Sequence, residues 1–182
     1  MAGLVLPIIS SALRSPWFKA TRDLTTAYGD HEGRLTPVTF NRTISDEYRV
    51  LRTAAGIFDV PEVPLEICGP DAPAFLDYVF TRPVSLMAVD RGRYGLMCHH
   101  GGGIACDGIV FRLAEDRFWY VHADRDVFTW LQALKPGYNV YIRNPGAWAI
   151  QIQGPASLEI LDACVDGGAP EGFKYYYSRQ VT

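Results

Sequence analysis

The stretch YGLMCHHGGGIACDGIVF, residues 94–111, decides how the central part of this chain folds. Two apolar segments flank three consecutive glycines, a pattern typical of a β-hairpin with a short glycine-containing loop. The second segment carries a carboxylate, Asp107, close to the β-branched residues Ile109 and Val110. Burying a carboxylate among apolar side chains is costly unless hydrogen bonds or charges compensate. We therefore expect Asp107 to be buried, either as a structural hydrogen-bond acceptor or as a functional carboxylate.

The composition is that of an ordinary globular protein. The chain has 182 residues, 48% of them apolar, and a formal net charge of −3. This balance gives no basic surface for a nucleic-acid duplex. No apolar run approaches the roughly 20 residues of a membrane span. We expect neither nucleic acid nor a membrane as a partner.

The cysteines bear on the cellular compartment. Cys68, Cys98, Cys106 and Cys164 follow no CxxC spacing, and each lies in or beside an apolar segment. The pattern favours buried thiols in a reducing compartment, with two disulfides as the alternative. At the N-terminus an apolar segment precedes the basic residues, the reverse of a secretory signal. We expect a cytoplasmic location, although an organelle transit peptide stays open because no acid precedes Asp23.

Residues 1–44 are rich in Pro, Gly, Ser and Thr, which predicts an N-terminal arm wrapping a core. Residues 45–182 are predicted to form the folded domain. Its first helix is expected to be capped by Ser45 and to stop at Gly56.

One local pattern occurs twice. A strand over 63–68, a Gly-Pro pair and a helix over 71–80 are repeated as a strand over 148–153, a Gly-Pro pair and a helix over 156–164. The repeat suggests a duplicated α+β layer, with helices on one face of a mostly antiparallel sheet. Chance similarity of two short units is the alternative.

Other elements lie between and after these copies. The predicted strands are 92–98 and 104–113 in the hairpin, then 118–122, 138–142 and 173–177, with a helix capped by Asp124 and ending at Leu134. The chain ends in SRQVT without an element that would close a sheet, so we expect the domain to be incomplete at its C-terminus.

Spacing alone defines no site. The three glycines lead into a strand and lack the GxxxxGK[ST] pattern, so they are not a phosphate-binding loop. His99 and His100 are neighbours whose side chains point to opposite faces of a strand, so we expect no metal site. Cys106 is either a nucleophile or an inert buried thiol, and the lack of a basic neighbour in the sequence favours the latter.

Four separated segments resemble one family. They are LRTAAGIFDV at 51–60, LEICGPDAPAFLDYV at 65–79, RYGLMCHHGGGIACDGIVFRLAEDRFWYV at 93–121 and AIQIQGP at 149–155. In this order they resemble the N-terminal part of the glycine cleavage T-protein (aminomethyltransferase) family, and the likeness covers about residues 45–177.

The resemblance implies a fold and a substrate. The fold is α+β, the N-terminal folate-binding domain of aminomethyltransferases, and the cofactor is tetrahydrofolate, which carries one-carbon groups. The family fold continues for about as many residues again, so this chain is expected to hold only part of the folate pocket.

Details within the family point to a branch. The family hairpin ends in two acids, and Cys106 stands in place of the first. LRSPWFKAT and HADRDVFTWLQAL resemble the branch that includes dimethylsulfoniopropionate demethylase. We therefore predict a demethylase that passes a methyl group from a small donor to tetrahydrofolate. The alternatives are T-protein-type transfer of a lipoyl-bound aminomethyl group with release of ammonia, or a folate-binding module without catalysis.

The resemblance also assigns site residues. Asp107 matches the family acid beside the pterin and the one-carbon group, so it is the predicted catalytic residue and a cofactor contact. Tyr94 matches an aromatic position near the folate pocket, and His99 falls where T-proteins often have Asn. The expected partner is a small-molecule methyl or aminomethyl donor, and the sequence does not fix the oligomeric state.

Overall fold

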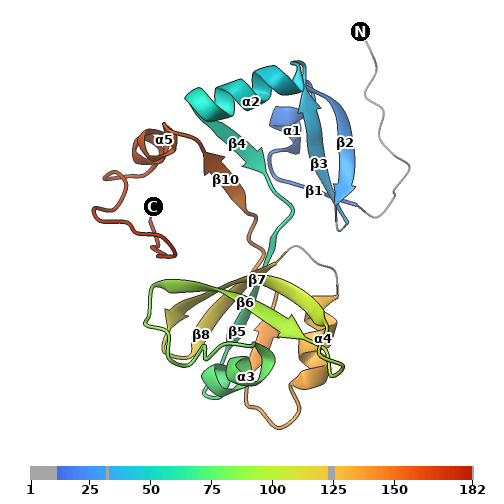
Figure 1. The fold of residues 1–182 in the computed structure, drawn as a ribbon, viewed down its shortest axis with the longest axis vertical. Helices are drawn as coiled ribbons and strands as arrows, with labels where there is room; N and C mark the ends of the chain where they lie inside the picture. Colours follow the sequence, from blue (N-terminus) through green and yellow to red (C-terminus); the bar gives the residue numbers. More distant parts are fainter. Residues whose placement is uncertain (1–11, 32, 123–125, 182) are drawn as a thin grey trace. The chain divides into compact units, whose positions relative to one another are not determined.

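The computed structural model describes residues 12–31, 33–122 and 126–181, and within them the chain forms two compact units (Figure 1). The first unit is drawn from Met1–Pro61, Trp148–Glu171 and Val181–Thr182, and the second from Glu62–Ala147 and Gly172–Gln180. The chain thus leaves the first unit and later returns to it, because β4 (Gly56–Asp59) pairs with β10 (Ile150–Gln153) in an antiparallel ladder. The boundary predicted at residue 44 is not the boundary between these units.

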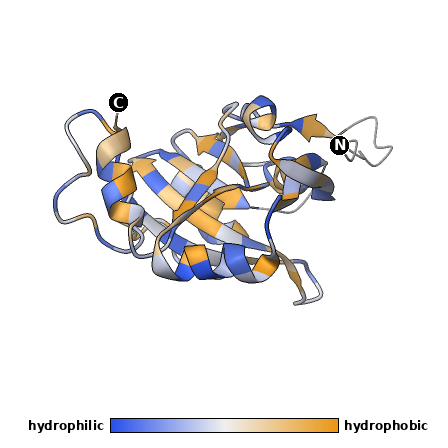
Figure 2. Ribbon diagram, turned by 90° about the horizontal axis from the view of Figure 1, so that it is seen from above, coloured by the Kyte–Doolittle hydropathy of each residue, from blue (hydrophilic) through white to orange (hydrophobic). Residues whose placement is uncertain are grey.

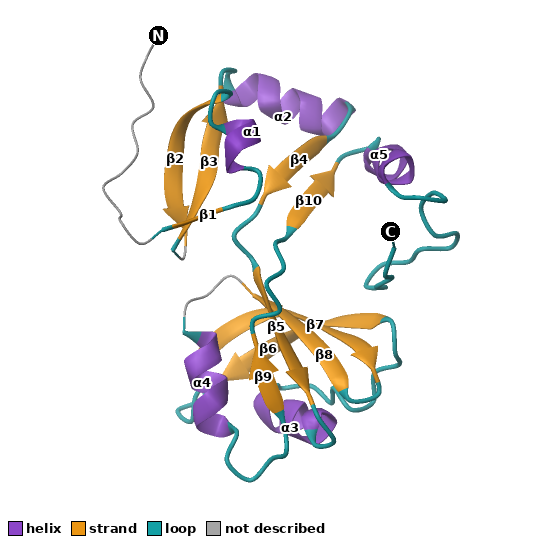
Figure 3. Cartoon of the chain, turned by 180° about the vertical axis from the view of Figure 1, so that it is seen from behind, coloured by secondary structure: helices purple, strands orange, loops and turns teal. Residues whose placement is uncertain are grey.

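The second unit contains a five-stranded sheet in the order β6-β7-β8-β5-β9. Its strands are β5 (Val63–Cys68), β6 (Arg91–Cys98), β7 (Ile104–Ala114), β8 (Arg117–His122) and β9 (Tyr141–Arg143). Every neighbouring pair is antiparallel. Helices α3 (Ala72–Val79) and α4 (Val127–Leu134) lie on one side of this sheet (Figure 3). The predicted α+β class with helices on one face is confirmed here.

The core of the second unit lies between the sheet and its helices. Along β8, Phe118 and Tyr120 are fully buried while Trp119 between them is only partly buried, as the period of two in a strand requires. They pack against Phe75 of α3 and Leu131 of α4 in one hydrophobic cluster. Colouring by hydropathy shows the alternation along the strands (Figure 2). The opposite face of the sheet carries both polar and apolar side chains, among them Glu66, Asp107, Ile109 and Trp119.

Local signals explain where these helices begin and end. Pro73 lies in the first turn of α3, where its missing N–H is not needed, and the extended backbone of Phe80 ends the helix. At α4 the N-cap position is Asp126, whose backbone is left-handed at φ 58°. The predicted cap, Asp124, lies outside the described residues.

The first unit holds two smaller sheets. The elements are β1 (Leu13–Arg14), α1 (Phe18–Thr21), β2 (Thr25–His31), β3 (Arg34–Phe40), α2 (Ile44–Thr53), β4, β10 and α5 (Ser157–Cys164). β3 pairs in parallel with β1 and antiparallel with β2. The predicted extended arm is therefore wrong for residues 12–44, because the hairpin of β2 and β3 buries Tyr28 and Leu35. Residues 1–11 of the predicted arm lie outside the described residues.

The cap of α2 is Thr43 and not the predicted Ser45. The Thr43 hydroxyl accepts a hydrogen bond from the backbone N–H of Asp46, 3.1 Å away. Since the helix begins at Ile44, Ser45 already lies inside the first turn, where its side chain cannot act as the N-cap. Thr43 and Ser45 are two positions apart, and capping propensity alone does not choose between two such hydroxyl residues.

The repeated Gly-Pro turns have the same conformation. Gly69 after β5 has φ 130° and Gly154 after β10 has φ 123°. A Cβ atom at either glycine would lie 2.5 Å from a backbone carbonyl oxygen, that of Asn139 or that of Ala54. Each turn therefore requires glycine for both backbone angle and space. The two copies belong to different units, so the repeat does not form a single layer.

Two predicted strands differ from the structure. The strand expected at 138–142 begins only at Tyr141, because a turn follows Gly137 at φ 95°. The strand expected at 173–177 is a turn with one isolated bridge, between Arg91 and Tyr177. The positive φ of Tyr176, 58°, is incompatible with an extended strand. Among the described residues, no helix combines the length and apolarity needed to cross a membrane.

Candidate functional site

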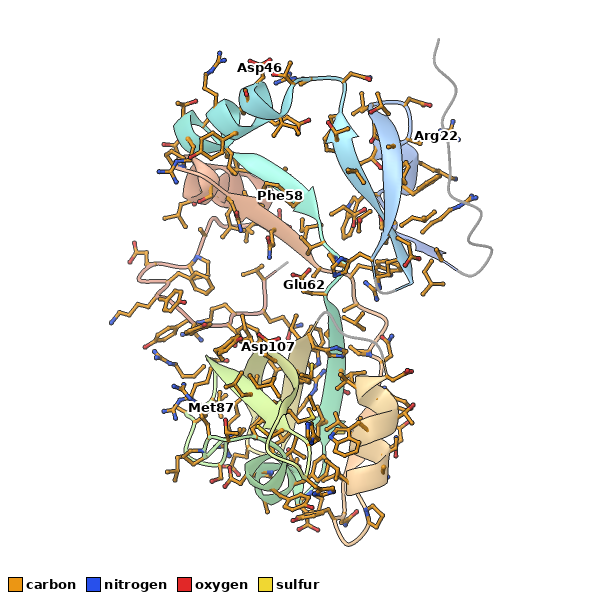
Figure 4. All side chains as sticks on the ribbon, turned by 45° about the vertical axis from the view of Figure 1, so that its right-hand side comes forward. Arg22, Asp46, Phe58, Glu62, Met87 and Asp107 are labelled. Atoms are coloured by element: carbon orange, nitrogen blue, oxygen red, sulfur yellow. The ribbon has the colours of Figure 1, made fainter. Side chains whose placement is uncertain are left out.

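The hairpin of β6 and β7 brings Tyr94 and Asp107 together. Tyr94 is paired with Ile109 and Leu96 with Asp107, so the two side chains lie diagonally on the same face of the sheet. The Tyr94 hydroxyl donates a hydrogen bond to Oδ2 of Asp107. Two of the predicted site residues are thus in direct contact, and Figure 4 labels Asp107 on this strand.

Asp107 is exposed, and the expectation that it is buried is wrong. Its neighbour Cys106 is 3% exposed and belongs to the core. Because side chains alternate along a strand, burial of Cys106 places Asp107 on the opposite face. The apolar residues around Asp107 in the sequence therefore do not all surround it in space.

The contact with Asp107 alters the acid–base properties of Tyr94. The hydrogen bond to Asp107 is the largest cause that raises the pKa of the Tyr94 phenol, and desolvation and the charge of Asp107 act in the same direction. The Tyr94 side chain is half-exposed, with 41% of its surface accessible. Tyr94 is therefore a neutral hydrogen-bond donor to the carboxylate at physiological pH, with its ring available to a ligand.

Cys106 has partners inside the core. Its Sγ lies 2.9 Å from the hydroxyl of Tyr120 and donates to the backbone carbonyl of Asp107 at 3.3 Å. These contacts turn the thiol away from the face that carries Asp107, which supports its interpretation as a structural thiol. All four cysteines lie in the described part of the chain, and no disulfide joins them. Cys164 is exposed, so the expectation of buried thiols does not hold for it.

His99 belongs to the turn of the hairpin. The Nδ1 atom of His99 accepts a hydrogen bond from the backbone N–H of Gly101 at 3.0 Å. The backbone N–H of His99 donates a hydrogen bond to the backbone carbonyl of Gly103. Gly102 has φ 84°, a conformation that favours glycine, and the antiparallel pairing of β6 with β7 confirms the predicted hairpin. The contact between Tyr94 and Asp107 does not include His99, whose part in cofactor binding stays a prediction.

The segment around Tyr176 lies beside β6, and the sequence does not predict this position. The carbonyl oxygen of Tyr176 accepts a hydrogen bond from the N–H of Gly92 on β6 at 2.6 Å. Tyr176 is also one of the smaller causes of the raised pKa of Tyr94. Three consecutive tyrosines, 175–177, are the only signal of this segment in the sequence, and their pattern predicts a strand.

A second polar cluster occupies the same sheet, on β5, β8 and β9. Glu66 is 2% exposed, and its carboxylate receives hydrogen bonds from Arg117 at 2.7 Å, Arg143 at 2.7 Å and the Trp119 indole at 3.0 Å. Burial raises the pKa of Glu66, but these hydrogen bonds outweigh it, and the net pKa is lowered. The cluster is fully paired, which is typical of a structural ion pair.

The first unit contains an apolar groove of about 590 Å³. It is lined by residues of β3, α2 and β4 and the segments next to them, among them Tyr48, Leu51 and Phe58. Its lining includes neither Tyr94 nor Asp107. This groove therefore does not contain the polar pair that could carry chemistry. Among the described residues, no group of His, Cys, Asp and Glu is arranged to hold a metal ion.

Comparison with known proteins agrees with this fold. The family profile described as the GCVT N-terminal domain matches residues 17–182. An aminomethyltransferase of Alkaliphilus oremlandii is 30% identical over 175 residues, 92% of this chain and 47% of that protein. One from Moorella thermoacetica is 34% identical over 154 residues, 75% of this chain and 42% of that protein.

A solved structure shares the fold. The glycine cleavage system aminomethyltransferase T from Bartonella henselae superposes with a TM-score of 0.84 at 23% identity, covering 92% of this chain and 47% of that one. The chain spans about half the length of the relatives it matches. On the profile match over most of its length, the chain belongs to the glycine cleavage T-protein (aminomethyltransferase) family and corresponds to its N-terminal part.

Proposed function

We propose that this chain is the N-terminal part of a tetrahydrofolate-dependent aminomethyltransferase of the glycine cleavage type. The single observation that carries the proposal is the Tyr94–Asp107 pair on the exposed face of the hairpin, in a chain of this family. The relatives are named aminomethyltransferase, which favours this alternative over the demethylase predicted as the main function.

Asp107 is the proposed catalytic residue, and Tyr94, His99 and Asp107 are the proposed folate contacts. A carboxylate stabilises a cationic carbon centre such as an iminium as positive charge develops on it. Tyr94 holds Asp107 in place by its hydrogen bond, so the carboxylate does not need to reorganise during the reaction. In the proposed reaction the aminomethyl carbon passes from the lipoyl sulfur to tetrahydrofolate and gives methylenetetrahydrofolate; the sulfur leaves as the thiol of dihydrolipoate, and the amino group leaves as ammonia.

The family and the length of its members define what this chain would supply. Since the relatives are about twice as long, the rest of the folate pocket is proposed to come from the part that they carry beyond this region. A cytoplasmic location goes with the proposal, since the four thiols form no disulfide.

Calorimetric titration with tetrahydrofolate tests the binding part on the chain itself. Aminomethyl transfer is measured after the chain is joined to the remaining half of the Alkaliphilus oremlandii aminomethyltransferase. We expect folate binding in both proteins and turnover in the joined one. Absence of folate binding in both would refute the proposal, and binding without turnover in the joined protein would leave a folate-binding module.

A further inference from the structure

The first unit buries few of its apolar side chains. Among the described residues, its buried apolar side chains are Tyr28 and Leu35, whereas every member of the hydrophobic cluster lies in the second unit. Helix α2, which is described in full, contains no buried residue. A helix of this length is not stable from its backbone hydrogen bonds alone and depends on packing of its apolar face. The described part of the chain does not bury that face.

The apolar face of α2 is open to the groove of the first unit. Ile44, Tyr48 and Leu51 are spaced by four and three residues, so they lie on one side of the helix, and all three line the groove. The ion pair between Asp46 and Arg49 lies on the opposite side. The helix therefore turns its apolar side, and not its charged side, toward the groove.

The strands beside the groove also have open edges. Ile57 and Phe58 of β4, the second of them labelled in Figure 4, line the groove. In the described chain β4 pairs only with β10, so this sheet has two strands and two free edges. A two-stranded ladder is marginally stable by itself, and its free backbone groups are able to pair with another strand. A polypeptide segment can supply both apolar side chains and a strand, whereas a small molecule cannot pair with a strand edge.

The lengths of the relatives identify a polypeptide that fits this surface. The chain matches 47% of the Alkaliphilus oremlandii aminomethyltransferase and 42% of the one from Moorella thermoacetica. In those proteins the unmatched half belongs to the same molecule, so its local concentration is high and apolar packing suffices to hold it. Large apolar patches on a protein surface mark such contacts.

We propose that the half of the relatives that this chain does not match packs into the groove beside α2 and completes the core of the first unit. The inference goes beyond the proposed function, because it concerns the assembly of two halves and not folate or catalysis. Its tests compare the 182-residue chain with the protein in which the chain is joined to the remaining half of the Alkaliphilus oremlandii aminomethyltransferase.

The first test is oxidation of side chains by hydroxyl radicals, followed by mass spectrometry. Tyr48 lines the groove and is 63% exposed, and Tyr78 on α3 of the second unit, 55% exposed, is the matched reference. We expect the oxidation rate of Tyr48 to fall several-fold in the joined protein while that of Tyr78 changes little. No fall at Tyr48, or an equal fall at both tyrosines, would overturn the inference.

The second test places a charge in the groove. Ile57→Asp is compared with Val38→Asp, because Ile57 and Val38 are 60% and 65% exposed in the same unit and only Ile57 lines the groove. In the chain alone both variants should change the thermal midpoint little, as exposed positions do. In the joined protein we expect Ile57→Asp to lower the midpoint by a further 5 °C, roughly, since its carboxylate would be buried among apolar side chains. Equal shifts for the two variants in the joined protein would contradict the inference.

A second copy of the chain is the competing occupant, and concentration separates the two. Oxidation of the chain alone is repeated at low and at high protein concentration. We expect the same rate at Tyr48 in both, and protection that increases with concentration would assign the groove to a second copy and overturn the inference. None of these measurements uses folate or turnover, so failure here leaves the proposed function intact, and absence of folate binding leaves this inference intact.

Discussion

The phenol of Tyr94 donates a hydrogen bond to the carboxylate of Asp107 across the β6–β7 hairpin, on the sheet face opposite the core. The two residues are 13 positions apart in the chain, and the glycine turn between the strands sets their register. A titratable pair on an exposed sheet face is positioned for a ligand more than for stability. Its removal should therefore affect binding and turnover first.

Asp107→Asn removes the charge and keeps the shape. In the joined protein we expect kcat to fall on the order of 100- to 1000-fold, as when one preorganised electrostatic group is lost from a site. The thermal midpoint of the chain should stay close to that of wild type, because Asp107 is exposed. Steady-state kinetics and a thermal melt measure the two effects. Unchanged kcat would show that Asp107 is not catalytic.

The pH titration of Tyr94 reports on the same contact. Because its pKa is raised, the folded state favours the neutral phenol, and the associated stability is complete below the usual tyrosine pKa of about 10 and lost as pH rises through the raised value. NMR of ring-labelled tyrosine, assigned with Tyr94→Phe, should show Tyr94 titrating above free tyrosine. In Asp107→Asn its pKa should move down, and a Tyr94 pKa unaffected by this change would contradict the hydrogen bond.

Glu66→Gln tests the ion pairs that join β5 to its neighbours. We expect a loss of about 2 kcal/mol in the free energy of unfolding, less than for a fully buried pair, because the Arg117 and Arg143 side chains are 46% and 52% exposed. Asp46→Asn, which breaks the exposed pair with Arg49, is the control and should cost at most about 1 kcal/mol.

The effect of Glu66 should also depend on pH. Its pKa is lowered in the folded state, so its stabilisation is present above the usual glutamate pKa of about 4.3 and is lost as pH falls through the lowered value. Urea unfolding of wild type and Glu66→Gln at a series of pH values measures this. The difference between them should shrink on acidification, and a constant difference would argue against a charged Glu66.

Gly69→Ala separates lack of space from backbone strain. Gly69 and Gly137 both have positive φ, but only at Gly69 would a Cβ atom meet a backbone oxygen, at 2.5 Å. We expect Gly137→Ala to cost about 1 kcal/mol from the backbone conformation alone, and Gly69→Ala to cost at least about 3 kcal/mol. Chemical denaturation measures both variants, and similar losses would show that the close approach to Asn139 is relieved by a small shift.

Thr43→Ala tests the cap of α2. We expect a loss of about 1 kcal/mol, because the N–H of Asp46 loses its side-chain acceptor. Ser45→Ala is the matched control, and it should have almost no effect because Ser45 lies inside the helix. If Ser45→Ala were the more harmful change, the helix would begin later than at Ile44.

The sequence by itself determined several local elements and the family. Alternation and glycine placement located β5 at residues 63–68 and the hairpin around 101–103, because these depend on neighbours in the chain. The ordered segments around Asp107 also sufficed to indicate an aminomethyltransferase-type domain, which the profile match shows.

Only the tertiary structure decided which residues meet. It placed Asp107 on the exposed face, because the burial of Cys106 fixes the orientation of β7, and a period of two does not say which face is covered. In the folded chain β10 belongs to the first unit, and Tyr176 lies beside Gly92. Such contacts between distant segments depend on packing and backbone pairing across the fold, which no local pattern encodes.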